Sequence, residues 1–394
     1  MSGRFFRLIL SLIILPVSIF LLITPDLFVK AENKTVVILP IWQSLSLPPA
    51  PPHWAARTRH SAIWTGSEML VWGGIGDPYR FLNDGYAYNP EFDSWSVITI
   101  EDAPSVRLMH SAIWTGTEMI IWGGWGDGGA LNSGGRYNPV TDTWLPVTME
   151  GAPSPRYGHS AIWTGTEMII WGGSYGTNDD LNDGARYNPA SDTWTDLPNL
   201  NTPSARGGHT AVWTGSEMII WGKGGLGNTK DGARYTLITN SWSAISTEGA
   251  PNIWVQPSAI WTGTEMIAWG GYGMAASYHP ETNSWTALPS IGSPGDRSDY
   301  TMVWTGLEVI IWGGWDGYKY CGDGFRFSPA TNTWSPMLMT NAPSARGLHA
   351  AVSTGSGMLV WGGHYFEDDT EYVLDDGANY QAYYKSFLPL CIKE

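Results

Sequence analysis

A fifteen-residue segment that recurs seven times constrains the fold of this chain more than any other feature of its sequence. The segment is clearest at residues 110–124, His-Ser-Ala-Ile-Trp-Thr-Gly-Thr-Glu-Met-Ile-Ile-Trp-Gly-Gly, and it returns almost letter for letter at residues 159–173. The other copies begin at His60, His209, Pro257, Tyr300 and His349. The Trp-Gly pairs of the copies are spaced by 43 to 50 residues. A fixed period of this length is typical of solenoids, propellers and repeat arrays.

The third copy shows what each repeat is expected to form. Residues 160–164 are short, apolar and β-prone, and Gly165 supplies the positive φ of a tight hairpin turn. Residues 167–171 are almost wholly apolar, which predicts a strand covered on both faces. Two further short strands are expected at residues 185–187 and from residue 193. Each copy therefore predicts a four-stranded antiparallel sheet that must pack against its neighbours.

Seven such sheets predict an all-β protein, a seven-bladed β-propeller spanning residues 53–394. Radial closure of the ring leaves only short, protected sheet edges. Along each blade the strands alternate in direction. The loops after the second and fourth strands should therefore share one face, here called the loop face. The Thr-Gly turns and the turns between the third and fourth strands should share the opposite face, here called the turn face.

Three recurring features resemble the Kelch-repeat family. They are an Arg three residues before the repeat His, a glycine pair after the second strand, and a Tyr followed seven residues later by a Trp. The Tyr/Trp pairs are Tyr88/Trp95, Tyr137/Trp144, Tyr187/Trp194, Tyr235/Trp242 and Tyr278/Trp285, with Phe327/Trp334 in the sixth copy. The resemblance extends over roughly residues 53 to 390. It implies a propeller of the galactose-oxidase superfamily and a binding surface on the loop face, around the channel mouth.

Aromatic residues outside the repeat positions suggest where a ligand binds. Flat aromatic faces stack on sugar rings or on the aliphatic parts of a peptide, and loops on a rigid scaffold are the usual place for binding. The alternative is that these aromatic residues only cap the ends of the blades. The candidate ligand-binding residues are Trp125, Tyr175, Trp254, Tyr272, Trp315, Tyr318, His364 and Tyr365.

The residues at repeat positions are interpreted as structural. Nineteen of the 24 tryptophans are expected in the core: seven in Trp-Gly pairs, six in Trp-Thr-Gly segments and six in the fourth strand. The repeat histidines are expected to hydrogen-bond neighbouring blades. The repeat arginines, Arg57, Arg107, Arg156, Arg206, Arg297 and Arg346, would ring the mouth and bind carboxylates if they were exposed. A structural role is favoured, with Asp84, Asp183, Asp231, Asp323 and Asp376 as partners.

No metal site is predicted. His364 lies near Tyr320 and Cys321 by blade order, which invites comparison with the copper site of galactose oxidase. That site is not expected here, because no second histidine outside the repeat positions is available on this face. The acidic loop at residues 367–371 gives a weak indication of calcium, but it lacks an ordered spacing of ligands. A solvated acidic loop is the favoured interpretation.

The N-terminus predicts export. Residues 1–31 combine Arg4 and Arg7 with an apolar run and a small-residue cleavage site, as in a signal peptide, with a retained N-terminal membrane anchor as the alternative. Residues 32–52 form a Pro-rich linker. The formal charge of −15 argues against nucleic acid and anionic lipid as partners.

Ring closure and the cysteines leave alternatives open. A strand containing Trp42 could complete the last blade, but the C-terminal segment around Phe387 is favoured, because Tyr380 and Phe387 repeat the seven-residue Tyr/Trp spacing. Cys321 and Cys391 are an even pair in a chain expected to be secreted, which permits one disulfide; two unpaired thiols are the alternative.

Taken together, these features favour a monomeric, non-catalytic binding module, secreted or anchored at the cell surface, whose partner is a carbohydrate or a protein. The alternative is a secreted carbohydrate-active enzyme, an oxidase, epimerase or lyase, with its site at the channel mouth. No cofactor and no catalytic residue are assigned.

Overall fold

The computed structural model describes residues 36–38, 41–48, 55–77, 79–177, 179–222, 231–251, 257–270, 274–382 and 384–386. The elements in these ranges are all β-strands. None of the described residues forms a helix with the length and apolarity needed to cross a membrane. Several sequence predictions lie outside the described residues. They are the export segment at residues 1–31, Trp254, Tyr272, Phe387 and Cys391.

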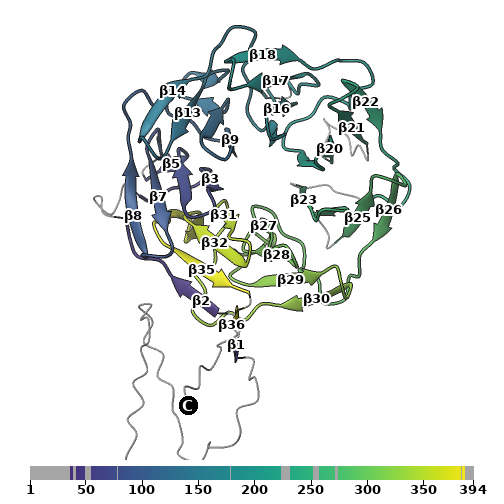
Figure 1. Cartoon of the computed structure of the whole chain (residues 1–394). Coiled ribbons are helices and arrows are strands. Elements are labelled where there is room, and N and C mark those ends of the chain that lie inside the picture. The colour runs from purple at the N-terminus through teal and green to yellow at the C-terminus, as the bar shows by residue number, and fades with distance from the viewer. Residues whose placement is uncertain are drawn as a thin grey trace, which may run out of the picture. The chain divides into compact units, whose positions relative to one another are not determined.

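The predicted seven-bladed propeller of four-stranded antiparallel sheets is confirmed (Figure 1). The first blade contains β3 (Ser61–Trp64), β4 (Met69–Trp72), β7 (Gly85–Asn89) and β8 (Ser94–Ile98). The second contains β9 (Ser111–Trp114), β10 (Met119–Trp122), β13 (Gly134–Asn138) and β14 (Thr143–Pro146). The third contains β15 (Ser160–Trp163), β16 (Met168–Trp171), β17 (Gly184–Asn188) and β18 (Thr193–Asp196).

The remaining blades repeat this order, with one change in the last. The fourth contains β19 (Thr210–Trp213), β20 (Glu217–Trp221), β21 (Gly232–Thr236) and β22 (Ser241–Ala244). The fifth contains β23 (Ser258–Trp261), β24 (Met266–Trp269), β25 (Ala275–His279) and β26 (Ser284–Ala287). The sixth contains β27 (Thr301–Trp304), β28 (Val309–Trp312), β29 (Gly324–Ser328) and β30 (Thr333–Pro336). The seventh contains β31 (Ala350–Ser353), β32 (Gly357–Trp361), β35 (Gly377–Gln381) and β2 (Ile41–Ser44).

The N-terminal strand completes the seventh blade, so the favoured C-terminal closure is wrong. β2 pairs with β35 in antiparallel register, placing Trp42 opposite Tyr380. Trp42 is 1% exposed, and its ring centroid lies 5.1 Å from that of Tyr380. Burial of this large indole accounts for the choice of outer strand. At the chain ends, β1 (Val36–Ile38) and β36 (Tyr384–Ser386) form a separate two-stranded sheet.

The second strand of each blade forms the centre of the core. β10, for example, is buried at all four positions, because the neighbouring blades cover both of its faces. Its register pairs Ile120 with Ile113 on the inner side and with Arg136 on the outer side. The seven Trp-Gly tryptophans are at most 1% exposed, as the repeat predicts.

The repeat arginines also belong to the fold, as predicted. All six are buried, and five of them pair with the predicted aspartates. The guanidinium of Arg156, for example, donates to the carbonyls of Gly172 and Asp183 and lies 3.1 Å from the Asp183 carboxylate. In the second blade the hydroxyl of Ser133 replaces the carboxylate and accepts from Arg107 at 3.1 Å.

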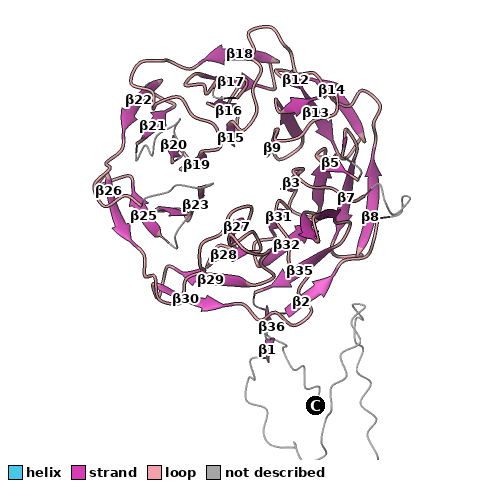
Figure 2. Ribbon diagram, turned by 180° about the vertical axis from the view of Figure 1, so that it is seen from behind, coloured by secondary structure: helices cyan, strands magenta, loops and turns pink. Residues whose placement is uncertain are grey.

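The first strands are the innermost strands of the ring, as Figure 2 shows from behind, and their side chains line a central channel. The six Trp-Thr-Gly tryptophans are half-buried: each packs against a hydrophobic core cluster, as predicted, but also lies in this wall rather than fully inside the core. The wall positions are Trp64, Trp114, Trp163, Trp213, Trp261 and Trp304, with Ser353 in the seventh blade. An inner strand has no further strand on its channel side, and for this reason the repeat places large apolar rings in contact with the channel.

Candidate functional site

Small hairpins extend the loop face beyond the blades. They are β5 (Ile75–Gly76) with β6 (Arg80–Phe81), β11 (Trp125–Gly126) with β12 (Gly129–Ala130), and β33 (His364–Glu367) with β34 (Thr370–Val373). Each lies between the second and third strands of its blade. Backbone bridges such as Thr58 to Ile75 and Leu108 to Trp125 join these loops to the segments that lead into the first strands. The two sets of loops thus share one face, as predicted.

A ring of left-handed residues surrounds the channel mouth on this face. In six blades it is the residue immediately before the repeat His or Tyr; the corresponding residue of the fifth blade lies outside the described residues. Gly158 and Gly208 occupy it in the third and fourth blades with φ of 63° and 65°. Other blades place side chains there at similar φ, at a cost of about 1–2 kcal/mol each; they are Arg59, Met109, Asp299 and Leu348. Residues with strained backbone conformations of this kind are often found at functional sites.

Neighbouring members of this ring are hydrogen-bonded to one another. The amide of Gly208 donates to the carbonyl of Gly158 at 2.7 Å, and the amide of Leu348 donates to that of Asp299 at 2.9 Å. Longer bonds of 3.3 Å join Gly158 to Met109 and Arg59 to Leu348. These bonds fix the backbone of the mouth, so the side chains of the ring are held in defined positions.

A pocket of about 570 Å³ opens at the glycine side of the ring. Gly158 and Gly208 leave space that a side chain fills in other blades, and Tyr157 forms part of the wall. Asp180 is the charged residue among those that line the pocket, and its carboxylate accepts a 2.6 Å hydrogen bond from the hydroxyl of Ser174.

The histidines of this pocket are uncharged at neutral pH. Burial lowers the pKa of His110, His159 and His209 to about 3. Their Nε2 atoms lie 2.8–2.9 Å from Ser61, Ser111 and Ser160, each in the preceding blade. The predicted interblade role is therefore confirmed for these three and for His349, which contacts Thr301 at 2.7 Å. For His60 it is wrong, since this ring has no hydrogen-bond partner within the described residues.

His364 is a buried member of a polar network rather than an exposed ligand. Its side chain is 6% exposed, and its Nδ1 atom contacts the Glu371 carboxylate across the β33–β34 hairpin. Its Nε2 atom lies 3.4 Å from the hydroxyl of Tyr320. Burial alone would raise the pKa of Glu371, but hydrogen bonds from His364 and Tyr79 outweigh it and hold that pKa below its usual value. The network ties the hairpin to the loops of the sixth and first blades.

The other predicted site residues are dispersed over the loop face. Trp125 packs edge-on against Tyr157, with ring centroids 5.2 Å apart. Trp315 packs against Tyr320 at 4.9 Å, and through it approaches His364. Tyr365 stacks on Tyr372 at 5.0 Å. These three residues support loops, as in the capping interpretation.

Exposed aromatic residues gather on the loop face. Tyr175 and Tyr318, both predicted, are 56% and 92% exposed. Tyr79, Phe366 and Tyr372 were not predicted and are 70%, 48% and 43% exposed. Phe92 is the sixth exposed aromatic residue of the described part of the chain, and it lies on the turn face. The three missed residues all fall within hairpins that extend loops, and loop length was the signal that could have found them.

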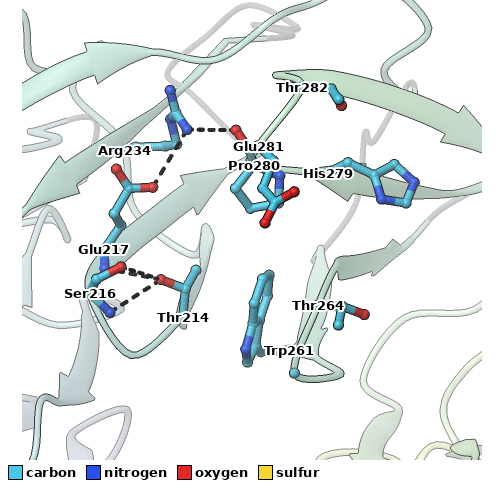
Figure 3. Close-up of a pocket in the computed structure, with 11 residues that line it drawn as sticks. Thr214, Ser216, Glu217, Arg234, Trp261, Thr264, His279, Pro280, Glu281 and Thr282 are labelled. Atoms are coloured by element: carbon cyan, nitrogen blue, oxygen red, sulfur yellow. Dashed lines mark hydrogen bonds and ion pairs between the residues drawn. The ribbon is translucent and has the colours of Figure 1, made fainter.

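A hollow of about 740 Å³ lies on the turn face between the fourth and fifth blades (Figure 3). Arg234 crosses this junction, donating to the carbonyl of Pro280 at 2.8 Å while its guanidinium lies 3.5 Å from Glu217. Trp261 forms a wall of the hollow. Figure 3 shows its indole nearly edge-on, with Thr214 and Glu217 to one side and Thr264 to the other.

Metal binding finds no support in the described residues, where no three His, Cys, Asp or Glu side chains are grouped to hold an ion. Glu367, Asp368 and Asp369 lie exposed at the tip of the β33–β34 hairpin. Cys321 is buried, and burial raises the pKa of its thiol. Its pairing with Cys391 stays a prediction.

A family model described as the KLHDC2/KLHL20/DRC7 Kelch-repeats domain matches residues 33–225, 136–279 and 208–384. These overlapping ranges cover the whole propeller. No curated protein matches the chain significantly.

Proposed function

Because the chain belongs to the Kelch-repeat family, we propose that it is a non-catalytic binding module that recognises a protein partner on its loop face. The polar side chains of the repeat are engaged in hydrogen bonds within the propeller itself. The buried arginines and the repeat histidines other than His60 are hydrogen-bonded to neighbouring strands and blades, and they leave the loops to carry specificity.

The observation that carries the proposal is the concentration of exposed aromatic side chains on these loops. Five of the six exposed aromatic residues among the described residues lie between the second and third strands of a blade. Tyrosine-rich loops on a rigid scaffold give large contact area at low entropic cost, as in antibody paratopes. The aromatic residues are spread over four blades and form no single groove, which favours a protein surface over a sugar chain.

The pocket beside Gly158 and Gly208, here called the mouth pocket, can hold one side chain of the partner as an anchor. Its volume suits a long side chain, its wall includes Tyr157, and Asp180 provides its charge. With the lining histidines neutral, the pocket carries net negative charge, and a lysine or arginine of the partner is the side chain that it favours.

Selection of a random peptide library on the immobilised full chain tests the proposal. We expect enriched peptides to contain a basic residue and to bind at least about tenfold more weakly to a variant carrying Tyr175→Ser, Tyr318→Ser and Phe366→Ser, because aromatic contacts dominate such interfaces. Phe92→Ser, which removes an equally exposed ring from the turn face, is the matched control.

Three outcomes are informative. Peptides that bind the triple variant as well as the native chain would exclude the loop face. Enriched peptides without basic residues would exclude only the Asp180 anchor. Enrichment of no peptide, together with binding of a glycan that the triple variant loses on a parallel glycan array, would restore the carbohydrate alternative for this face.

The partner is further proposed to be extracellular. The support is the sequence of residues 1–31, with Arg4 and Arg7 before an apolar run and a small-residue cleavage site. N-terminal sequencing of the protein from its native cell decides this point. A mature chain that begins near residue 32 is expected after cleavage, and a chain that begins at Met1 and partitions with membranes would indicate a retained anchor.

A further inference from the structure

Two junctions of the turn face combine features that the other junctions lack. Between the fourth and fifth blades, Arg234 reaches across to the carbonyl of Pro280, beside Trp261. Between the second and third blades, Arg136 reaches in the same way to the carbonyl of Pro189, beside Trp163, in a hollow of about 590 Å³.

The neighbouring junctions each lack one of these groups. Ala87 and Ser277 occupy the arginine position in the first and fifth blades. At the junction that follows Arg186, Leu237 stands where Pro189 and Pro280 stand. Ser353 replaces the tryptophan at the junction that follows Arg326. The two hollows are thus particular to these positions of the ring rather than a general consequence of the repeat.

The walls of each hollow offer one flat apolar surface and several polar groups. Between the fourth and fifth blades, the indole of Trp261 is half-buried, so that part of it stays accessible. Glu217, Thr264 and Glu281 lie around it, and Glu217 contacts the guanidinium of Arg234. Carboxylate oxygens accept hydrogen bonds from hydroxyl groups, and threonine hydroxyls can donate or accept.

This combination suits a pyranose ring. The axial hydrogens of a hexose form an apolar face that packs on an indole, while its hydroxyls bond to carboxylates at the edge. Arg234 is already held by Glu217 and Pro280, and Glu281 adds a second carboxylate at the exposed rim. The excess of negative charge in this hollow disfavours acidic sugars. In the hollow between the second and third blades, Glu118 is balanced by Arg136, and Ala190 stands in place of Glu281.

We propose that these two hollows are binding sites for a neutral hexose unit of a saccharide, each built on one tryptophan beside a Glu–Arg pair. They lie on the turn face, away from the loops assigned to the protein partner, and the two sites can engage two branches of one glycan. Paired weak sites of this kind gain affinity through effective concentration.

Saturation-transfer difference NMR on the full chain tests the proposal. The probes are methyl β-D-galactopyranoside, methyl β-D-glucopyranoside and methyl α-D-mannopyranoside, with 3′-sialyllactose as the charged comparison. We expect transfer to the ring protons of at least one hexoside and weaker transfer to the sialic acid protons. A double variant, Thr166→Arg with Thr264→Arg, places a long cation at the rim of each hollow and should abolish the transfer.

Leu307→Arg is the matched control, because Leu307 holds the equivalent turn position of the sixth blade and is 71% exposed. These three substitutions are at exposed turn positions, so the fold should be kept.

A second comparison removes the tryptophans. The double variant Trp163→Leu/Trp261→Leu should lower the affinity for the hexoside by about tenfold. Trp304→Leu should not, because its junction has Ser277 in place of arginine. Absence of transfer to all three hexosides, transfer that survives in the Thr166→Arg/Thr264→Arg variant, or equal loss in Leu307→Arg would overturn the proposal. None of these results bears on the peptide selection at the loop face.

Discussion

The Nε2 atom of His110 lies 2.8 Å from the hydroxyl oxygen of Ser61, across the junction of the second and first blades. The same contact joins His159 to Ser111 and His209 to Ser160. At the seam where the ring closes, the equivalent pair is His60 and Ala350, so the hydroxyl is missing. The closing junction therefore leaves a buried imidazole without the bond that the other histidine junctions make.

Supplying the missing hydroxyl should stabilise the ring. We expect Ala350→Ser to raise the free energy of unfolding by about 0.5–1.5 kcal/mol, the net value of one intramolecular hydrogen bond. Ser61→Ala, the reverse change at an intact junction, should lower it by about 1–3 kcal/mol, because the His110 ring loses its partner while buried. Urea unfolding followed by tryptophan fluorescence measures both.

The His60 explanation can be separated from a general effect of serine. In a His60→Phe background, Ala350→Ser has no imidazole to bond, and the gain should disappear. An equal gain in both backgrounds would show that the hydroxyl acts on something other than His60.

A buried arginine should matter far more than the carboxylate beside it. Arg156 is fully buried and donates to the carbonyls of Gly172 and Asp183, whereas the Asp183 side chain is 54% exposed. We expect Arg156→Leu to cost about 3–5 kcal/mol, since both carbonyls lose a charged donor. Asp183→Asn should cost at most about 1 kcal/mol, as for a solvent-screened pair. Equal losses in the two variants would contradict this division of roles.

The closing strand gives a third prediction. Trp42 is buried against Trp312 and Tyr380, with ring centroids 5.5 and 5.1 Å apart. Trp42→Ala should therefore lower the free energy of unfolding by about 3–5 kcal/mol. Leu47→Ala is the control, because Leu47 is 61% exposed and its loss should change stability by less than about 0.5 kcal/mol. A small effect of Trp42→Ala would mean that β2 does not hold the ring closed.

The repeat made the blades predictable, because seven aligned copies reveal which positions are shared. Arg156 and Asp183 could be paired from sequence alone, since their spacing recurs in most copies. The closing strand was harder. Trp42 precedes His60 by 18 residues, whereas Trp144 precedes His159 by 15, and the extra linker residues hid the equivalence.

The candidate sites depend on contacts between blades, which the sequence of one copy does not contain. The mouth pocket exists because Gly158 and Gly208 lack the side chains found at Met109 and Leu348. The aligned copies show glycine at this position in the third and fourth blades and larger residues in others. Only the φ values show that these residues share one left-handed ring. Arg234 and Pro280 are 46 residues apart, and their contact follows from the packing of adjacent blades.

The neutral histidines make the stability of the propeller dependent on pH. Burial lowers the pKa of His110, His159, His209 and His349 from the usual 6.5 to about 3. Below pH 6.5 these side chains bind protons in the unfolded chain but not in the folded one. Their contribution to stability is therefore present above pH 6.5 and is lost as the pH falls toward 3. Each should lower the free energy of unfolding by up to about 1.4 kcal/mol per pH unit in this window.

Replacing one histidine isolates its share of this dependence from that of the carboxylates. Tyr300 holds the histidine position in the sixth blade and donates a 2.9 Å hydrogen bond to the carbonyl of Trp269, so His159→Tyr introduces a side chain that the fold already accommodates. We expect urea unfolding between pH 6.5 and pH 4 to show that the free energy of unfolding falls less steeply with pH in this variant. The difference in slope should correspond to one fewer proton taken up on unfolding. The carboxylates are common to both chains and cancel in the difference. Parallel curves for the variant and the native chain would mean that His159 is protonated in the folded state, and that its contact with Ser111 does not depend on a neutral ring.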